Sequence, residues 1–259
     1  MRFVLVGLAA LLSTALAAEG QTVYERFLVP LYGAPVAGAY GSRWGVETWV
    51  YYSGAEDTEI VPRLDVCMLT CHPFYALPAG EAPVRLEPAY TGSSLLLHVD
   101  QRLAAAFHFA SRVRDLSRGD GSGTEIPVVH ESRFSGAPLH LLNVPIRQGS
   151  RNTLRVYALP EVADPAVEIR YFRMPRQELD RTPDLRRVDR IGLRTQPGVD
   201  GFLVRPSIAT LDFQIAELQS GDAAWLEIVP LTPGLRIWAM VSVTDNATQH
   251  VTLITPASR

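Results

Sequence analysis

The chain has 259 residues, of which 47% are hydrophobic and 20% charged, and its formal net charge is −3. This profile is typical of a globular protein and excludes a mainly disordered chain. All 24 basic residues are arginines and the 27 acidic residues outnumber them. Because nucleic-acid binders carry an excess of basic charge, no nucleic-acid partner is expected. A chain of this length can bury a core without a bound metal, so no cofactor or metal site is expected either.

The N-terminus has the form of a secretory signal. Residues 3–12 are apolar and follow Arg2, and residues 15–17 (Ala-Leu-Ala) fit the small-x-small cleavage rule. We therefore expect residues 1–17 to be a signal peptide and the secreted or periplasmic protein to begin at Ala18. The sequence has no later run of about 18 apolar residues, so no membrane span is expected.

Short apolar runs rich in Val, Ile, Tyr, Trp and Phe alternate with Gly or Pro about every ten residues, a pattern typical of strands and turns. No segment keeps a 3.6-residue period over three turns, although residues 101–114, 178–188 and 208–218 have room for a short helix. The sequence therefore predicts an all-β fold. The expected strands are residues 26–30, 47–52, 58–64, 95–99, 104–110, 126–129, 153–158, 166–172, 224–229, 236–244 and 250–254.

A glycine-rich segment divides the predicted strands into two groups. Residues 118–123 contain no residue suited to a core, which predicts a linker between one unit over residues 18–117 and another over residues 124–259. The two units repeat each other weakly and in the same order, which predicts two tandem immunoglobulin-like β-sandwiches. One larger sandwich or jelly roll is the alternative. The matching runs are 48–51 with 154–157, 58–61 with 167–170, 96–99 with 225–228, and 102–107 with 234–239.

Several longer stretches of the mature chain resemble uncharacterised exported bacterial proteins with tandem β-sandwich-like units. The resemblance covers most of the mature chain and implies export and the same organisation. Those proteins have no assigned activity, so the resemblance implies no function. The stretches are Cys67-x-x-x-Cys71, residues 112–118, 124–129 and 141–145, and residues 238–256 (WAMVSVTDNATQHVTLITP).

The two cysteines, Cys67 and Cys71, are the most reactive-looking residues of the sequence. Together with His72 they supply three ligands for a zinc ion, but a structural site requires four. In an oxidising compartment, a local disulfide is the expected state, with a metal site or free thiols as the alternatives. Because strand geometry would hold the two Cα atoms about 13 Å apart, the disulfide requires the segment to fold back.

No catalytic residues are expected. The sequence has neither a G-x-S-x-G elbow nor an H-E-x-x-H helix, and its six histidines are scattered. Carboxylate pairs such as Glu56 and Asp57 would need a defined separation across a cleft to act on a glycosidic bond. Surface turns are the simpler interpretation of these pairs.

One segment has an unusual charge. Residues 170–194 contain eight arginines against four acidic residues, a local charge of +4. Arg186, Arg187 and Arg190 are the candidate anion-binding residues, because guanidinium groups bind carboxylates and sulfates in a bidentate manner. An acidic polysaccharide or another surface protein would be the partner. The alternative is that these arginines form ordinary exposed ion pairs with their acidic neighbours.

The aromatic residues divide into two groups. Tyr40 and Trp44, in a glycine-rich stretch, are the one pair expected to be available to a sugar. The rings inside the repeated strands are expected to fill the core. These rings are Trp49, Tyr51, Tyr157, Trp225 and Trp238.

The sequence thus indicates an exported, non-catalytic surface or extracellular interaction module with an unknown ligand. A secreted hydrolase acting on a glycan or peptide is the alternative. A pocket that gathers histidines and carboxylates would favour the hydrolase.

Overall fold

The computed structural model describes residues 23–60, 75–80, 82–86, 94–119, 123–174, 182–195, 206–215, 218 and 220–257. These residues form antiparallel β-sheets with three short 3-10 helices, so the predicted all-β class is confirmed. No helix in these ranges is long and apolar enough to cross a membrane. The predicted signal peptide and both cysteines lie outside the described residues.

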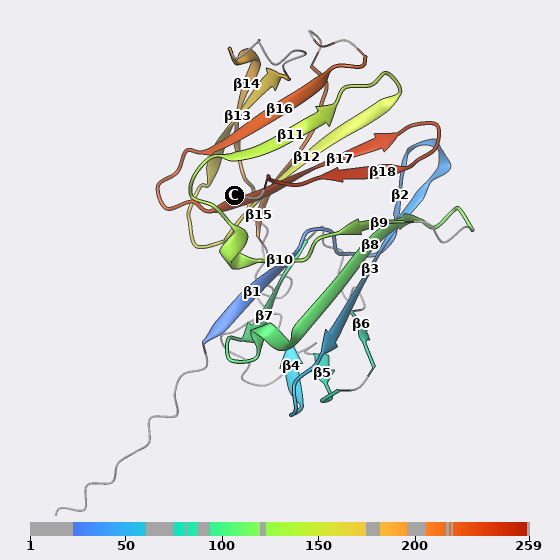
Figure 1. The fold of residues 1–259 in the computed structure, drawn as a ribbon, viewed down its shortest axis with the longest axis vertical. Helices are drawn as coiled ribbons and strands as arrows, with labels where there is room; N and C mark the ends of the chain where they lie inside the picture. The colour runs from blue at the N-terminus through green and yellow to red at the C-terminus, as the bar shows by residue number, and fades with distance from the viewer. Residues whose placement is uncertain are drawn as a thin grey trace, which may run out of the picture.

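The N-terminal half, residues 24–133, is the lower group of strands in Figure 1. One sheet has the order β10-β1-β7, a second has the order β2-β3-β8-β9 with β6 also on β3, and β4 pairs with β5. The elements are β1 (Tyr24–Val29), β2 (Val36–Ala37), η1 (Ala39–Gly41), β3 (Arg43–Tyr52), β4 (Thr58–Ile60), β5 (Tyr75–Leu77), β6 (Val84–Leu86), β7 (Leu95–Asp100), η2 (Ala104–Ala106), β8 (Phe107–Asp115), β9 (Thr124–Ile126), β10 (Val129–His130) and η3 (Glu131–Arg133).

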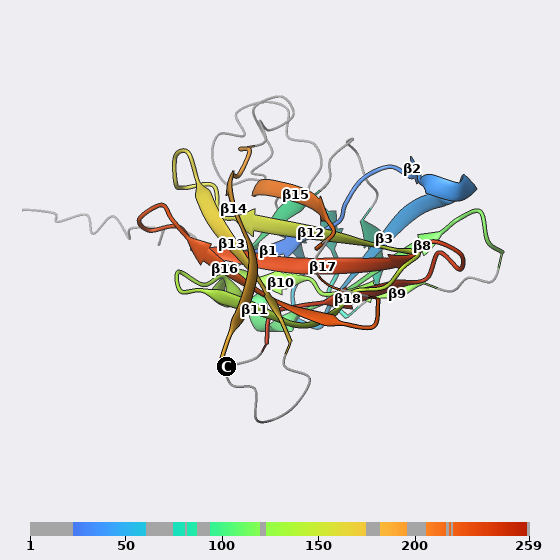
Figure 2. The same cartoon turned by 90° about the horizontal axis from the view of Figure 1, so that it is seen from above.

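The C-terminal half, residues 139–254, is the upper group in Figure 1 and consists of two four-stranded sheets. Their orders are β11-β16-β13-β14 and β15-β12-β17-β18. Seen from above in Figure 2, β12, β17 and β18 run side by side across the molecule. The strands are β11 (Leu139–Pro145), β12 (Ser150–Ala158), β13 (Ala166–Arg173), β14 (Asp184–Gly192), β15 (Ser207–Phe213), β16 (Ala223–Pro230), β17 (Ile237–Asp245) and β18 (Val251–Ile254).

Each half contains its own hydrophobic core, and a third core joins them. Strand β12 shows how alternation builds two of these cores, because Leu154 and Val156 face the core between the two C-terminal sheets while Tyr157 faces the N-terminal half. On β7, Leu97 faces the core of the N-terminal half and Leu96 faces the third core. We call this third cluster the interface core. Its buried members are Leu28, Leu96, Val113, Ile126, Val129, Phe134, Tyr157, Leu159, Ile208, Trp238 and Met240.

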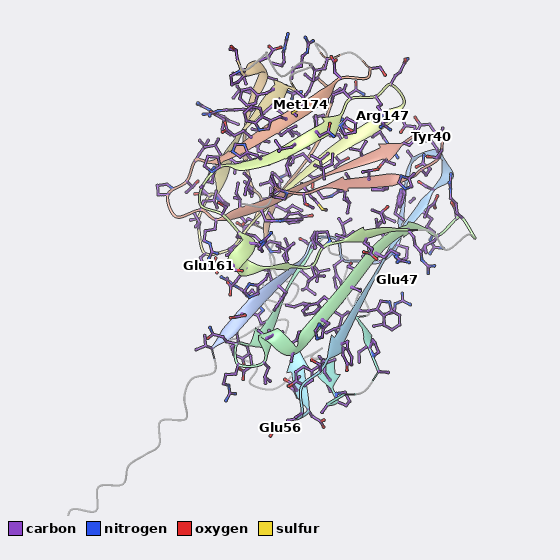
Figure 3. The ribbon with its side chains drawn as sticks, viewed as in Figure 1. Tyr40, Glu47, Glu56, Arg147, Glu161 and Met174 are labelled. Atoms are coloured by element: carbon purple, nitrogen blue, oxygen red, sulfur yellow. The ribbon has the colours of Figure 1, made fainter. Side chains whose placement is uncertain are left out.

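Polar contacts reinforce the interface core. The buried Tyr157 hydroxyl donates a hydrogen bond of 2.8 Å to the Pro30 carbonyl oxygen, 127 residues away in sequence. The Arg26 guanidinium lies 2.6 Å from Glu131 and also pairs with Glu161 of the C-terminal half. Figure 3 shows Glu161 beside the junction of the two groups of strands. The two halves are therefore joined by buried packing as well as by the chain.

The strands on either side of the glycine-rich segment belong to one sheet of the N-terminal half. Strands β8 and β9 on either side of it pair with each other, for example Val113 with Thr124, and β10 pairs with β1. Residues 124–130, predicted to belong to the second unit, therefore hydrogen-bond to strands of the first. The described start of the segment is also anchored, because the Asp115 carboxylate accepts hydrogen bonds from the backbone N–H groups of Arg43 and Ser117. Glycine suits the tip of a hairpin as well as a linker, and composition does not separate the two.

Five strand pairings of the N-terminal half have a counterpart in the C-terminal half, whereas β13·β16, β1·β10 and β2·β3 have none. The matching pairs join strands at the same places in chain order: β1·β7 corresponds to β11·β16, β3·β8 to β12·β17, β8·β9 to β17·β18, β4·β5 to β13·β14, and β3·β6 to β12·β15. The predicted run 48–51 lies in β3 and its match 154–157 lies in β12. Tyr51 pairs with His108, as Tyr157 pairs with Trp238, and in both pairs the ring centroids are 5.8 Å apart.

The three segments with room for a helix are mostly strand. Within residues 101–114, the one described helix is η2, and β8 follows it. The described parts of the other two segments belong mainly to β14 and β15. Tertiary pairing outweighed their weak helical pattern. Six strands have no counterpart among the predicted ones: β2, β5, β6, β11, β14 and β15.

Candidate functional site

A cleft of about 690 Å³ lies between the two halves and combines polar and apolar walls. One wall is the outer face of the sheet β15-β12-β17-β18, and the other is formed by residues 31–39 with β3 and β8. Figure 3 shows Tyr40 beside β2, close to the same end of β17 and β18. The residues that line the cleft include Gly38, Trp44, Arg151, Thr153, Arg155 and Asp212.

The cleft exists because the outer face of β12 is only partly covered. At one end of the strand, Tyr157 is fully buried in the interface core beside Trp238. Arg155 and Arg151 lie on the same face two and six residues away from Tyr157, and both line the cleft. The face thus changes from apolar, where the N-terminal half covers it, to polar, where the cleft opens.

Two half-buried arginines dominate the polar wall. Arg155 donates a hydrogen bond of 3.0 Å to the Ser242 hydroxyl, and Arg151 donates one of 3.2 Å to Gln249 Oε1. Neither guanidinium contacts a carboxylate of the described chain. The one acidic residue in the lining, Asp212, instead accepts a hydrogen bond of 2.5 Å from the Thr153 hydroxyl. Two arginines against one aspartate give the lining a formal charge of +1.

The opposite wall is apolar and contains Trp44. A Cβ atom on Gly38 would lie 2.5 Å from the Trp44 ring, so only glycine allows the backbone to approach the indole this closely. The neighbouring Tyr40 has a φ of 56°, a left-handed conformation that is uncommon outside glycine, and its ring is 73% exposed. The Arg151 guanidinium lies 5.7 Å from the centre of that ring. A strained residue and a close glycine therefore shape the cleft edge.

Chemically, the cleft offers guanidinium and hydroxyl donors on one side and an aromatic ring on the other. A carboxylate or sulfate would supply the charged partner that Arg151 and Arg155 otherwise lack. A sugar ring or other flat, partly apolar group would pack against Trp44. The cleft thus combines the features of a binding site for an acidic, partly apolar ligand.

The structure does not place the three predicted anion-binding arginines on one surface. Arg187 is paired in register with buried Tyr171, and its guanidinium lies 5.3 Å from the centre of that ring. Arg190 is opposite Glu168, whose neighbour Ile169 faces the core, so Arg190 projects from the other side of the sheet.

Each of these arginines also has an acidic partner. Arg186 pairs with Asp184, Arg187 lies 2.8 Å from Asp189, and Arg190 Nε lies 2.7 Å from Glu168. Glu168 also binds Arg170 at 2.7 Å. The hydrogen bonds from Arg190 and Arg170 hold the pKa of the Glu168 carboxyl below its ordinary value. The three arginines thus form ion pairs with acidic residues, of which Glu168 is buried, and anion binding by the three residues stays a prediction.

A second constellation surrounds His130. Its Nε2 lies 2.8 Å from Glu25 Oε2 and its Nδ1 lies 2.7 Å from the Ser132 hydroxyl, with His130 and Ser132 lining a hollow of about 520 Å³. This is the order of contacts of a nucleophile, a base and an orienting carboxylate. The backbone N–H of Ser132 also donates to Nδ1 at 3.2 Å, so the ring caps the first turn of η3. The ring therefore caps η3 in addition to its contacts with Glu25 and the Ser132 hydroxyl.

The structure corrects the expectation for the large rings. Tyr157 and Trp238 are buried as expected, and Trp225 is half-buried and stacked on Phe172. Trp49 and Tyr51, however, are 41% and 36% exposed. Both project from the outer face of the sheet β2-β3-β8-β9, which no described strand covers. The predicted disulfide between Cys67 and Cys71 lies outside the described residues, and the described residues contain no group of metal ligands.

Comparisons with known proteins return no match to a family model, to a curated protein or to a solved structure. The function must therefore be inferred from the residues and geometry of the site itself.

Sequence reasoning identified Tyr40 and Trp44 but missed Arg151 and Arg155. On a strand with polar residues at 151, 153 and 155, these arginines resemble any solvent-facing residues. Both arginines line a cleft because the N-terminal half covers only part of the β15-β12-β17-β18 sheet. The local sequence pattern does not encode how much of that sheet is covered.

Proposed function

We propose that this protein is an exported, non-catalytic binding module that holds an acidic polysaccharide in the cleft between its halves. The observation that carries the proposal is the pair of half-buried arginines, Arg151 and Arg155, which face Trp44 across the cleft and have no carboxylate partner among the described residues. Export is inferred from the signal-like N-terminus.

The chemistry of the two walls favours an acidic sugar over other anions. A uronic acid residue presents a carboxylate for a guanidinium, hydroxyls for Thr153 and Ser242, and a C–H face for the indole of Trp44. A small inorganic anion would use only the polar wall. A repeating acidic polymer would also remain bound at the open ends of the cleft.

The test measures binding of the purified mature protein to polygalacturonate, either as retardation in affinity electrophoresis or as a dissociation constant by calorimetry. Arg155→Gln, alone and with Arg151→Gln, is expected to weaken binding about tenfold or more, because each substitution removes a charge-assisted hydrogen bond. Arg155→Lys, which keeps the charge but loses the guanidinium fork, should bind with intermediate strength. Binding of the parent should weaken with added salt.

The matched control is Arg186→Gln/Arg187→Gln/Arg190→Gln, which removes three arginines outside the cleft. The proposal expects this variant to bind like the parent. If it loses binding and Arg155→Gln does not, the anion site lies on β14 instead. If the parent retains no acidic polysaccharide at low salt, the proposal is wrong.

The contacts of His130 favour one second candidate, a serine hydrolase. In that case, Ser132 would react with a fluorophosphonate probe, and Ser132→Ala and His130→Gln would each abolish labelling. Absence of labelling of the folded parent would exclude this candidate.

A further inference from the structure

The outer face of β3 and β8 presents aromatic side chains to solvent. Trp49 and Tyr51 are two residues apart on β3 and therefore project from the same side of the sheet. Their cross-strand partners on β8 are Ala110 and His108. We call this surface the β3–β8 face.

The rings of this face are held in place by their neighbours. His108 stacks on Tyr51 with an interplanar angle of 25°, and its Nε2 lies 3.3 Å from the Ser53 hydroxyl. Beside Trp49, the small side chain of Ala110 leaves one edge of the indole unobstructed. A groove of about 700 Å³ begins there and continues past Arg112 to β9 and β18.

The rim of the groove carries balanced charges. Glu47 pairs with Arg114, and Arg112 lies 3.5 Å from Glu125. Figure 3 shows Glu47 at the side of the sheet formed by β3 and β8. Among the described residues of the rim, Arg112 and Arg114 each have an acidic partner, so neither is left to attract an anion. The groove offers hydrogen-bond donors and acceptors side by side, which suits the hydroxyl groups of a neutral ligand.

The corresponding face of the C-terminal half shows that the exposure is not a requirement of the strand pairing. Tyr157 and Trp238 occupy the same cross-strand position as Tyr51 and His108, but they are buried under the N-terminal half. Burying large rings stabilises a fold, so leaving Trp49 and Tyr51 partly in water forgoes that gain. Exposed aromatic rings grouped on one face mark binding surfaces.

From the ring pair, the open groove and the balanced rim, we infer that the β3–β8 face binds a neutral polysaccharide. A pyranose ring would place its C–H face on Trp49, and the next sugar would lie in the groove with its hydroxyls on Arg112 and Glu125. The patch of rings is small compared with the roughly 800 Å² that each partner buries in a standard protein interface, which favours a sugar over a protein. This second site is independent of the proposed acidic-polysaccharide cleft.

The test uses affinity electrophoresis of the mature protein in gels containing a soluble β-1,3-glucan, a β-1,4-xylan or hydroxyethyl cellulose. At least one of these neutral polymers should retard the parent, and Trp49→Ala should bind it about tenfold more weakly. Trp49→Phe keeps a ring and should restore part of the affinity. Tryptophan fluorescence should change when the parent binds the polymer, and this change should be absent in both variants.

Arg155→Gln is the matched control, because it alters the acidic-ligand cleft and leaves the β3–β8 face intact. It should bind the neutral polymer like the parent, while Trp49→Ala should bind polygalacturonate like the parent. Failure of one site therefore does not imply failure of the other. If no polymer of the panel retards the parent, or if Trp49→Ala binds as well as the parent, the inference is wrong. If sedimentation shows that the parent self-associates and Trp49→Ala does not, the face is a protein interface and the inference is again overturned.

Discussion

Strands β7 and β16 occupy corresponding places in the two halves, yet they are buried differently. On β16, Leu226 and Ile228 are buried while Trp225 and Glu227 are partly exposed, the alternation of a sheet with one solvent face. On β7, five consecutive residues from Leu95 are buried. The reason is that β7 lies between the core of its own half and the interface core, so both of its faces are covered, including the face that carries His98.

We expect packing between the halves to contribute to the stability of both, because each half contributes residues to the interface core. The C-terminal sandwich has a core closed by its own two sheets. If the halves were separated, the β10-β1-β7 sheet would expose Leu28 and Leu96, and the β15-β12-β17-β18 sheet would expose Tyr157 and Trp238. The first two of the following experiments test how strongly the halves are joined, and the third tests an ion pair on the open face of the C-terminal half.

The largest effect is expected from the corresponding tyrosines. Tyr157→Ala removes a fully buried ring and its hydrogen bond to Pro30, and should lower the free energy of unfolding by about 3–5 kcal/mol. Tyr51→Ala removes a partly exposed ring and should cost about 1 kcal/mol or less. Urea unfolding of both variants measures the difference. Equal costs would mean that the interface core contributes little.

Limited proteolysis should have a smaller effect. Trypsin is expected to cleave after exposed Arg118, in the connection between β8 and β9. Because β9 remains paired with β8 and the interface core joins both fragments, the nicked protein should elute from a sizing column as one particle. Its fragments should separate only in denaturant. Two freely separating fragments would support independent domains on either side of residues 118–123.

The smallest effect is expected from Glu168 on the open face of the C-terminal half. Arg190 and Arg170 hold its pKa in the folded state below the unfolded value, so the carboxylate stabilises the fold above the unfolded pKa and loses that contribution as the pH falls through the folded pKa. Glu168→Gln should therefore reduce stability at pH 7, and the difference from the parent should shrink in acid. Thermal unfolding between pH 2 and pH 7 measures this trend. A difference that is constant with pH would rule out the ion pairs as its cause.

The fold class could be predicted from the sequence because strand signals are local. Ten of the eleven predicted strands overlap one described strand, and the eleventh, 126–129, covers the end of β9, the start of β10 and the residues between them. Strands such as β11 and β14 were missed because their residues lack a clear alternation. In β14, Arg187 lies on the inner side of the sheet, a position that the pattern alone would assign to a hydrophobic residue.

The candidate site was only half predictable. The glycine-rich run around Tyr40 and Trp44 marks a special backbone, and the structure places both at the cleft. No sequence feature distinguishes Arg151 and Arg155 from other arginines on strands, whereas the arginine-rich segment 170–194 has a visible excess of positive charge. A count of charges along the chain does not show that those arginines have partners, such as Glu227 for Arg170, that lie outside the segment.

The sequence by itself determined the all-β class and the positions of most strands, because these follow from backbone preference and alternation. Only the tertiary structure decided which of two similar faces is covered. Tyr51 and Tyr157 occur in matching runs and pair with aromatic partners at the same distance, yet one ring faces solvent and the other is buried. That outcome depends on how one sheet stacks on another, a contact between residues more than a hundred positions apart that no local pattern specifies.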